Sequence, residues 1–244
     1  MRVLIAEQDH ANYARLLAEA APDLQVVTSG DSAELARLAP DSPVWLGQPD
    51  LLASLLRQGH KPQWVQSTWA GITPLLADGL PRDYRLTRAV GIFGQVMAEY
   101  MLTYMLGHER DVLSRLVSQV ERRWDDRPGR TLEGRQVLIV GTGDIGQRVA
   151  EFLLPFGVVL RGVASSAREQ APFVEVAGLD QLPRMVEQAD YVLNLLPDTP
   201  ATHDLYDAAL FKRFKPSALF INAGRGGAVV DGDLVEALKE GHLA

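Results

Sequence analysis

The sequence predicts an α/β protein made of two doubly wound, parallel-sheet domains. Short apolar stretches alternate with segments of helical periodicity along the chain, a pattern typical of parallel sheets covered by helices on both faces. A glycine-rich turn follows one apolar stretch just past the middle of the chain. The longest helical pattern lies between the two halves, so we expect a first domain over residues 1–94, a bridging helix and connection over 95–135, and a second domain over 136–244.

The first 94 residues contain no glycine-rich phosphate loop, so we expect no nucleotide there. Short apolar runs predict strands, and apolar residues at three- and four-residue steps predict helices, with Pro22, Gly59 and Pro62 marking helix ends. The predicted strands span residues 3–6, 24–28, 43–46, 64–67 and 84–89, and the predicted helices span 11–20, 31–38 and 51–56.

Residues 95–120 predict one long helix that bridges the domains. Methionines, a tyrosine and aliphatic residues recur there at three- and four-residue steps, which is more typical of core packing than of cofactor contact. The charged segment 121–135 contains Pro128 and Gly129 and predicts an exposed connection anchored by Trp124.

The glycine-rich turn has the spacing G-x-G-x-x-G between a buried strand, 137–140, and an amphipathic helix. Gly141 permits the tight turn, Gly143 allows close approach of a pyrophosphate, and Gly146 allows close packing of helix on strand. The free N–H groups at the helix start favour phosphate. We therefore expect nucleotide binding here, with a tight turn that binds no ligand as the alternative.

The remaining segments resume the alternation of strands and helices. The predicted strands span residues 158–163, 174–177, 191–196 and 218–223, and the predicted helices span 147–156, 179–188, 208–214 and 233–240. No His/Asp/Glu cluster has metal-ligand spacing, and no G-x-S-x-G elbow of a hydrolase is present.

The second strand of this domain bears on coenzyme choice. In a dinucleotide site that strand normally ends in Asp or Glu, which binds the ribose hydroxyls, but here Ala164 stands at the tip. Ser165, Ser166 and Arg168 follow, and hydroxyls with a guanidinium suit a 2′-phosphate. We therefore expect NADP in preference to NAD; the alternative is that Arg168 only opens a solvated loop.

Composition excludes several classes of protein. The net charge of −7 argues against a nucleic-acid partner held by a basic surface. With no cysteine there are no disulfides or thiolate sites, which suits a reducing compartment. The N-terminal apolar run is too short for a signal peptide, and no segment approaches the ~20 apolar residues that span a bilayer. We expect a cytoplasmic protein that does not bind membranes.

Five segments together resemble the D-isomer-specific 2-hydroxyacid dehydrogenases. They are residues 141–146 (GTGDIG), 194–202 (NLLPDTPAT), 220–231 (FINAGRGGAVVD), 64–72 (WVQSTWAGI) and 97–100 (MAEY). Within that family the chain is most similar to glyoxylate/hydroxypyruvate reductases, and Ala164 is similar to their NADPH-using members. The resemblance implies a flavodoxin-like substrate domain, a Rossmann cofactor domain and a homodimer formed through the cofactor domain and the long helix.

The resemblance also implies site residues. Arg225 would hold the carboxylate and carbonyl oxygen of a small 2-oxo acid, a role that suits its planar fork; the alternative is an exposed arginine on a glycine loop. Backbone N–H groups at Ala70, Gly71 and Ile72 would bind the carboxylate, and Trp69 would wall the pocket or pack internally. The coenzyme would contact the turn and neighbouring loops at Met97, Gly141, Gly143, Asp144, Ile145, Gly146, Ser165, Ser166, Arg168, Leu196, Pro197, Thr202, Ala223 and Gly224. Core packing is the alternative for Met97, as is an ordinary strand end and turn for Leu196, Pro197 and Thr202.

The match breaks at the C-terminus. The family continues with a strand, a glutamate and a histidine that form the proton donor pair, and a helix that returns to the first domain; none of the five histidines here matches that histidine. We expect a shortened record of an enzyme of about 310 residues, with a stable 244-residue product as the alternative. We expect the chain as written to bind coenzyme weakly and to show little or no turnover. The leading hypothesis is an NAD(P)H-dependent reductase of glyoxylate or hydroxypyruvate. The alternatives are a binding protein that senses the nicotinamide cofactor and a related dehydrogenase of phosphoglycerate or formate.

Overall fold

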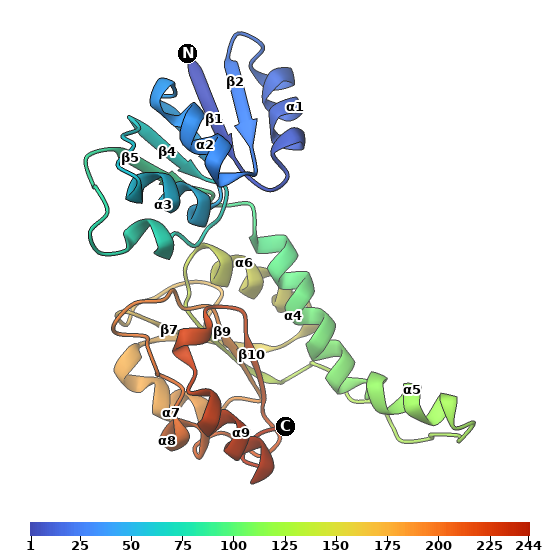
Figure 1. The fold of residues 1–244 in the computed structure, drawn as a ribbon. Coiled ribbons are helices and arrows are strands. Elements are labelled where there is room, and N and C mark those ends of the chain that lie inside the picture. Colours follow the sequence, from blue (N-terminus) through green and yellow to red (C-terminus); the bar gives the residue numbers. More distant parts are fainter. The chain divides into compact units, whose positions relative to one another are not determined.

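The computed structural model describes all 244 residues and divides them into two compact units, Met1–Val90 and Gly91–Ala244. Each unit is built on a parallel five-stranded sheet (Figure 1). The predicted fold class is confirmed. The division at residues 94 and 135 stays a prediction about domains, and the helix expected to bridge the domains belongs to the second unit.

The first unit has the strand order β2-β1-β3-β4-β5, the order of flavodoxin-like folds. Leu4, Trp45 and Val65 are fully buried and form its core with the apolar face of α3, while α1 contributes no buried residue. The strands are β1 (Arg2–Ala6), β2 (Gln25–Ser29), β3 (Val44–Gly47), β4 (Trp64–Ser67) and β5 (Arg85–Arg88). The helices are α1 (His10–Ala20), α2 (Ser32–Leu38) and α3 (Pro49–Arg57), with 3₁₀ turns at Ala39–Asp41 and Thr73–Leu76.

The second unit has the strand order β10-β9-β6-β7-β8, with all strands parallel. Taken in chain order this is the 3-2-1-4-5 arrangement of a Rossmann sheet, and its order reverses between β6 and β9. The strands are β6 (Gln136–Val140), β7 (Val159–Ala164), β8 (Glu175–Gly178), β9 (Tyr191–Asn194) and β10 (Leu219–Asn222). The helices are α4 (Gly94–Glu109), α5 (Val112–Val120), α6 (Asp144–Leu153), α7 (Leu182–Val186), α8 (Ala208–Phe211) and α9 (Asp231–Lys239), with 3₁₀ turns at Leu154–Phe156, Leu179–Gln181 and Gly226–Ala228.

The second sheet is buried on both faces, which explains why its strands are continuously apolar. Leu138 and Val140 face α7, α8 and α9, whereas Val137 and Ile139 face α4 and α6. Helices α4 and α6 lie side by side (Figure 1), and Gly94 makes this possible, because a Cβ there would lie 2.6 Å from Cβ of Arg148.

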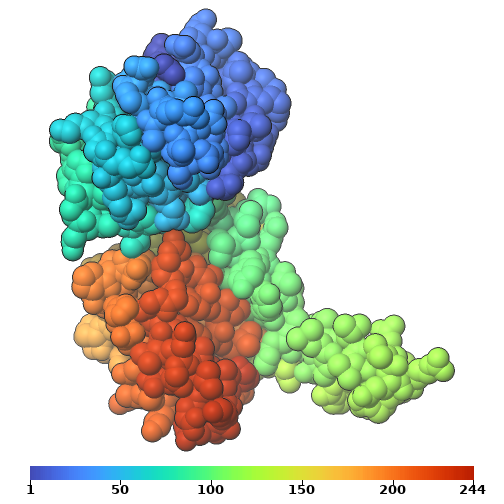
Figure 2. Space-filling model, in the orientation of Figure 1, coloured from blue at the N-terminus to red at the C-terminus, as the bar shows by residue number.

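The prediction of a single helix over residues 95–120 is wrong. The chain forms α4 and α5, separated at Asp111, whose φ of 49° is left-handed. Helix α5 and the segment after it form an arm that extends away from the rest of the second unit (Figures 1 and 2). Trp124 does not anchor this segment within the chain, because 90% of its surface is exposed. None of the helices has the length and apolarity needed to cross a membrane, and the cytoplasmic location stays a prediction.

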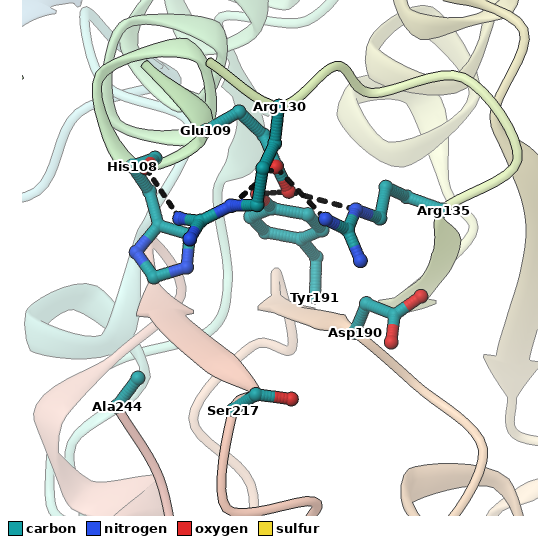
Figure 3. Close-up of a pocket in the computed structure, with 8 residues that line it drawn as sticks. All are labelled: His108, Glu109, Arg130, Arg135, Asp190, Tyr191, Ser217 and Ala244. Atoms are coloured by element: carbon teal, nitrogen blue, oxygen red, sulfur yellow. Dashed lines mark hydrogen bonds and ion pairs between the residues drawn. The ribbon is translucent and has the colours of Figure 1, made fainter. Parts of the chain in front are cut away.

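A buried carboxylate joins the end of α4 to the sheet. Glu109 is 2% exposed and lies between the guanidinium groups of Arg130 and Arg135, at 3.1 and 2.9 Å, while the Tyr191 hydroxyl donates to it at 2.6 Å (Figure 3). Burial acts to raise the pKa of Glu109, but the hydrogen bonds from Tyr191 and Arg135 and the charge of Arg135 outweigh it, so the pKa is lowered. The pKa of Tyr191 is raised by burial and by its bond to Glu109.

The pocket around this cluster, of about 290 Å³, lies at the amino ends of the strands, because Arg135 precedes β6 and Asp190 precedes β9. Open α/β sheets bind their ligands at the opposite, carboxyl edge. Nearby, Asp190 accepts hydrogen bonds from the Gln136 N–H and from Lys215, both at 2.8 Å. We therefore regard the cluster as structural.

The cluster predicts a pH-dependent contribution to stability. Glu109→Gln places an amide NH₂ beside two guanidinium groups, so it should lower the free energy of unfolding at pH 7 by about 2 kcal/mol. Because the folded pKa of Glu109 is lowered, its contribution is fully present above the ordinary value of 4.5 and is lost as pH falls through the folded value. Urea denaturation at several pH values measures this.

The matched control is Glu187→Gln, which removes an exposed pair with Arg213 and should cost at most about 0.5 kcal/mol. An equal, small effect of both substitutions would contradict the structural role of the Glu109 cluster.

Candidate functional site

The glycine-rich turn joins β6 to α6 at the point where the strand order reverses. Gly141 has a φ of 107°, and a Cβ there would lie 2.9 Å from the carbonyl carbon of Leu195. A Cβ on Gly146 would overlap the Gly141 carbonyl oxygen, whereas one on Gly143 would meet nothing within 4 Å. Packing thus requires the first and third glycines, and the middle one faces open space. This arrangement fits a ligand that approaches the backbone at Gly143.

Helix α6 presents its N-terminus at this turn. It begins at Asp144, earlier than predicted, so Ile145 and Gly146 lie within its first turn. No side chain caps the helix, and its first-turn N–H groups remain for a ligand. The Asp144 carboxylate accepts a hydrogen bond from the Gly91 N–H at 3.0 Å, so this predicted coenzyme residue already has a protein partner. Ile145 is half-buried against the core.

The loop after β7 supplies the predicted 2′-phosphate groups. Ala164 is buried at the strand end, whereas Ser165, Ser166 and Arg168 are exposed along a surface pocket of about 990 Å³. Arg168 does more than open a solvated loop, because its Nη2 donates a hydrogen bond to the Thr142 hydroxyl of the glycine-rich turn at 2.7 Å. The structure therefore places a guanidinium beside the turn and no carboxylate at the tip of β7.

The loops after β9 and β10 complete this edge of the sheet. Gly224 packs against the loop after β9, because a Cβ there would lie 2.7 Å from the Leu196 carbonyl oxygen. Leu196 is buried and Pro197 is exposed. Thr202 is buried and uses its hydroxyl to hold its own turn, donating to the Pro197 carbonyl at 2.6 Å. Ala223 is half-buried.

Arg225 follows β10 on this same edge. It is exposed, has no acidic partner, and its only side-chain hydrogen bond is to the Gly224 carbonyl at 2.8 Å. Two amides brace its loop: Asn194 donates to Asn222 at 2.9 Å, and Asn222 donates to the Arg225 carbonyl at 3.2 Å. The sequence predicted no role for these asparagines, although a polar residue at the end of an apolar run was an available signal. In the structure Asn194 is fully buried.

The remaining predicted coenzyme residue, Met97, lies on α4. It is half-buried and packs against the apolar cluster of the second sheet. Packing accounts for its position in this structure, and its coenzyme role stays a prediction.

In the first unit, the predicted carboxylate-binding loop follows β4. Ser67 is fully buried, and its hydroxyl accepts from the Trp69 N–H at 3.0 Å. Arg88 donates to the Ala70 carbonyl at 2.8 Å. Trp69 is 47% exposed and so is not packed internally, while Gly71 and Ile72 are half-buried. The loop is thus braced from both sides within its own unit.

The loop also borders Glu7, a buried carboxylate at the end of β1. The Thr68 hydroxyl lies 3.4 Å from Glu7 Oε1, and burial raises the pKa of Glu7. No group of three or more His, Asp or Glu side chains forms a possible metal site in the structure.

Three comparisons with known proteins bear on this arrangement. Residues 102–244 match the model of the D-isomer specific 2-hydroxyacid dehydrogenase NAD binding domain. The chain is 28% identical, over 82% of its length, to glyoxylate/hydroxypyruvate reductase A of Photorhabdus laumondii, and spans 65% of that protein. It therefore covers less than two thirds of this curated relative.

Two solved structures resemble the chain closely. A D-isomer specific 2-hydroxyacid dehydrogenase family protein from Aeromonas salmonicida is 38% identical with a TM-score of 0.92, over 99% of this chain and 78% of that one. The NADPH-dependent glyoxylate/hydroxypyruvate reductase from Sinorhizobium meliloti, in complex with NADP and sulfate, is 27% identical with a TM-score of 0.82 and the same coverage.

The geometry of the turn predicts a sharp difference between two glycines. Gly146→Ala inserts a methyl group against a backbone oxygen that cannot move aside, so it should lower the free energy of unfolding by about 3 kcal/mol. Gly143→Ala has room and should change it by less than about 1 kcal/mol. Chemical denaturation of the two variants measures the difference; equal stability would contradict the packing described.

Proposed function

The chain belongs to the D-isomer-specific 2-hydroxyacid dehydrogenase family, and we propose that the protein reduces a small 2-oxo acid to the D-2-hydroxy acid with NADPH or NADH. The observation that supports this most is the carboxyl edge of the second sheet, where a glycine turn and a helix N-terminus follow β6 and the exposed Arg225 follows β10, two strands away. Such an edge is where open α/β sheets bind dinucleotides.

The coenzyme supplies the hydride when bound, and the residues present fit it. The first-turn N–H groups of α6 and the open side of Gly143 would hold the pyrophosphate. Arg168, with Ser165 and Ser166, would hold the 2′-phosphate, so we propose NADP as the preferred coenzyme. The reductase from Sinorhizobium meliloti bound to NADP supports this preference.

The substrate would be bound through its two oxygen-bearing groups. We assign to Arg225 the role of holding the carboxylate and polarising the carbonyl oxygen, because its fork is exposed and has no carboxylate partner. The N–H groups at Ala70, Gly71 and Ile72 are assigned to the substrate carboxylate. Glyoxylate and hydroxypyruvate are the proposed substrates, in line with the named activity of the relatives.

The test of this function is a coenzyme-oxidation assay on the product of the complete gene, with NADPH and glyoxylate or hydroxypyruvate. Arg225→Gln should lower kcat/KM by about 100-fold or more, because it removes a charge that stabilises developing negative charge. Arg213→Gln, at an exposed position before β10, serves as the control and should be neutral.

Absence of coenzyme oxidation with every small 2-oxo acid would contradict the proposal. Full turnover by Arg225→Gln would contradict its assigned role. If the protein binds coenzyme without turnover and Arg225→Gln alters only partner binding, the protein is a cofactor sensor instead.

We also propose a homodimer formed through the arm. Helix α5 buries only Ser118, whereas its aliphatic side chains are widely exposed. The exposed apolar residues of the arm are Val112, Leu113, Leu116, Val117, Val120 and Trp124. A contiguous apolar surface of this kind typically marks a protein interface, and a second copy offers the same surface.

Leu116→Glu should convert the dimer to a monomer in sedimentation velocity, because it places a charge in the buried interface while leaving the exposed position in the monomer unstrained. Leu238→Glu, at a 49% exposed position on α9, is the matched control and should remain dimeric. A monomeric wild type, or a dimer unaffected by Leu116→Glu, would contradict the arm interface.

A further inference from the structure

Gln170, in the loop between β7 and β8, makes an unusually complete set of hydrogen bonds. Its Nε2 donates to the Thr142 carbonyl at 2.9 Å and to Gln147 Oε1 at 2.6 Å. Its Oε1 accepts from the Thr142 hydroxyl at 3.0 Å and from Arg168 Nε at 2.9 Å. All four hydrogen-bonding positions of the amide are therefore used, and they join the glycine-rich turn, helix α6 and the loop after β7.

The orientation of Thr142 is imposed from the other side. Thr142 is 3% exposed, and its methyl group occupies the space that a Cβ on Gly162 of β7 would fill. With the methyl group seated on the strand, the hydroxyl points to Arg168 and Gln170, with which it forms hydrogen bonds. The absence of a side chain at Gly162 thus determines where the hydroxyl lies.

These contacts hold one edge of the Arg168 guanidinium. Nε donates to Gln170 and Nη2 donates to Thr142, whereas Nη1 has no hydrogen-bond partner in the protein. The side chain is exposed along the pocket that also contains Ser165 and Ser166. A planar fork held along one edge presents its other edge in a defined direction.

We propose that Gln170 is a positioning residue for coenzyme selectivity, which holds Arg168 against the glycine-rich turn so that the free edge of the guanidinium meets the 2′-phosphate of NADP. This rests on the proposed preference for NADP. A guanidinium that is already held in place loses less conformational freedom when the phosphate binds. Selectivity then depends on the Thr142–Gln170–Arg168 network and not on the arginine alone.

The test uses calorimetric binding of ADP-ribose and 2′-phospho-ADP-ribose, which needs no turnover. Gln170→Met keeps the length of the side chain and removes its hydrogen bonds. It should lower the affinity for 2′-phospho-ADP-ribose about tenfold, the factor for one ordinary hydrogen bond. It should change the affinity for ADP-ribose by less than about twofold. Gln188→Met, at an exposed position without side-chain hydrogen bonds, is the matched control.

A double-mutant cycle separates positioning from direct contact. Arg168→Met should abolish the preference for the 2′-phosphate, and Gln170→Met added to it should lower the preference no further. Additive effects would overturn the proposal, because Gln170 would then act on the phosphate independently. Equal weakening of both ligands by Gln170→Met would also overturn it, since that result indicates general support of the turn; so would no change.

Gln147→Met provides a second variant if Gln170→Met does not fold. It removes one acceptor of the Gln170 amide without touching Arg168, and should weaken 2′-phospho-ADP-ribose in the same sense but less. No selective weakening would overturn the proposal. If wild type and Arg168→Met show the same ratio of affinities for the two ligands, the proposed preference for NADP itself fails. That result is distinct from failure of the role proposed for Gln170 alone.

Discussion

The contact between Gly146 and the carbonyl oxygen of Gly141 is the constraint on which the second unit depends. No side chain fits between them, so the first turn of α6 lies directly against the end of β6. This directs the helix N-terminus to the carboxyl edge of the sheet, at the point between β6 and β9 where the strand order reverses. The hydroxyl of Thr142, in the same turn, accepts a hydrogen bond from Arg168 in the loop after β7.

The amino and carboxyl edges of this sheet differ in how their charged side chains are paired. At the amino edge, charged side chains are paired: the buried Glu109 with Arg130 and Arg135, and Asp190 with Lys215. At the carboxyl edge, Arg225 and the outer edge of Arg168 are left without acidic partners, while amides rather than charges brace their loops. The paired charges therefore lie on one side of the sheet, and the cationic groups free to bind an anionic ligand lie on the other.

The sequence was sufficient for features that depend on local patterns. Both parallel sheets followed from short apolar runs, and the roles of Gly141 and Gly146 followed from their spacing and agree with the packing. The sequence was insufficient for features that depend on contacts between residues far apart in the chain. The break at Asp111 interrupts a continuous helical pattern, and the asparagine brace joins residues 28 apart. Gln170 carried no motif, because its partners come from the turn and from α6.

The central claim is that this turn binds the pyrophosphate of a nicotinamide coenzyme, with the 2′-phosphate beside Arg168. A crystal structure of the protein with NADPH tests it most directly. We predict phosphate oxygens within hydrogen-bond distance of the N–H groups at the start of α6 and a 2′-phosphate on Arg168 Nη1. Coenzyme bound elsewhere, or a 2′-phosphate turned away from Arg168, would contradict it.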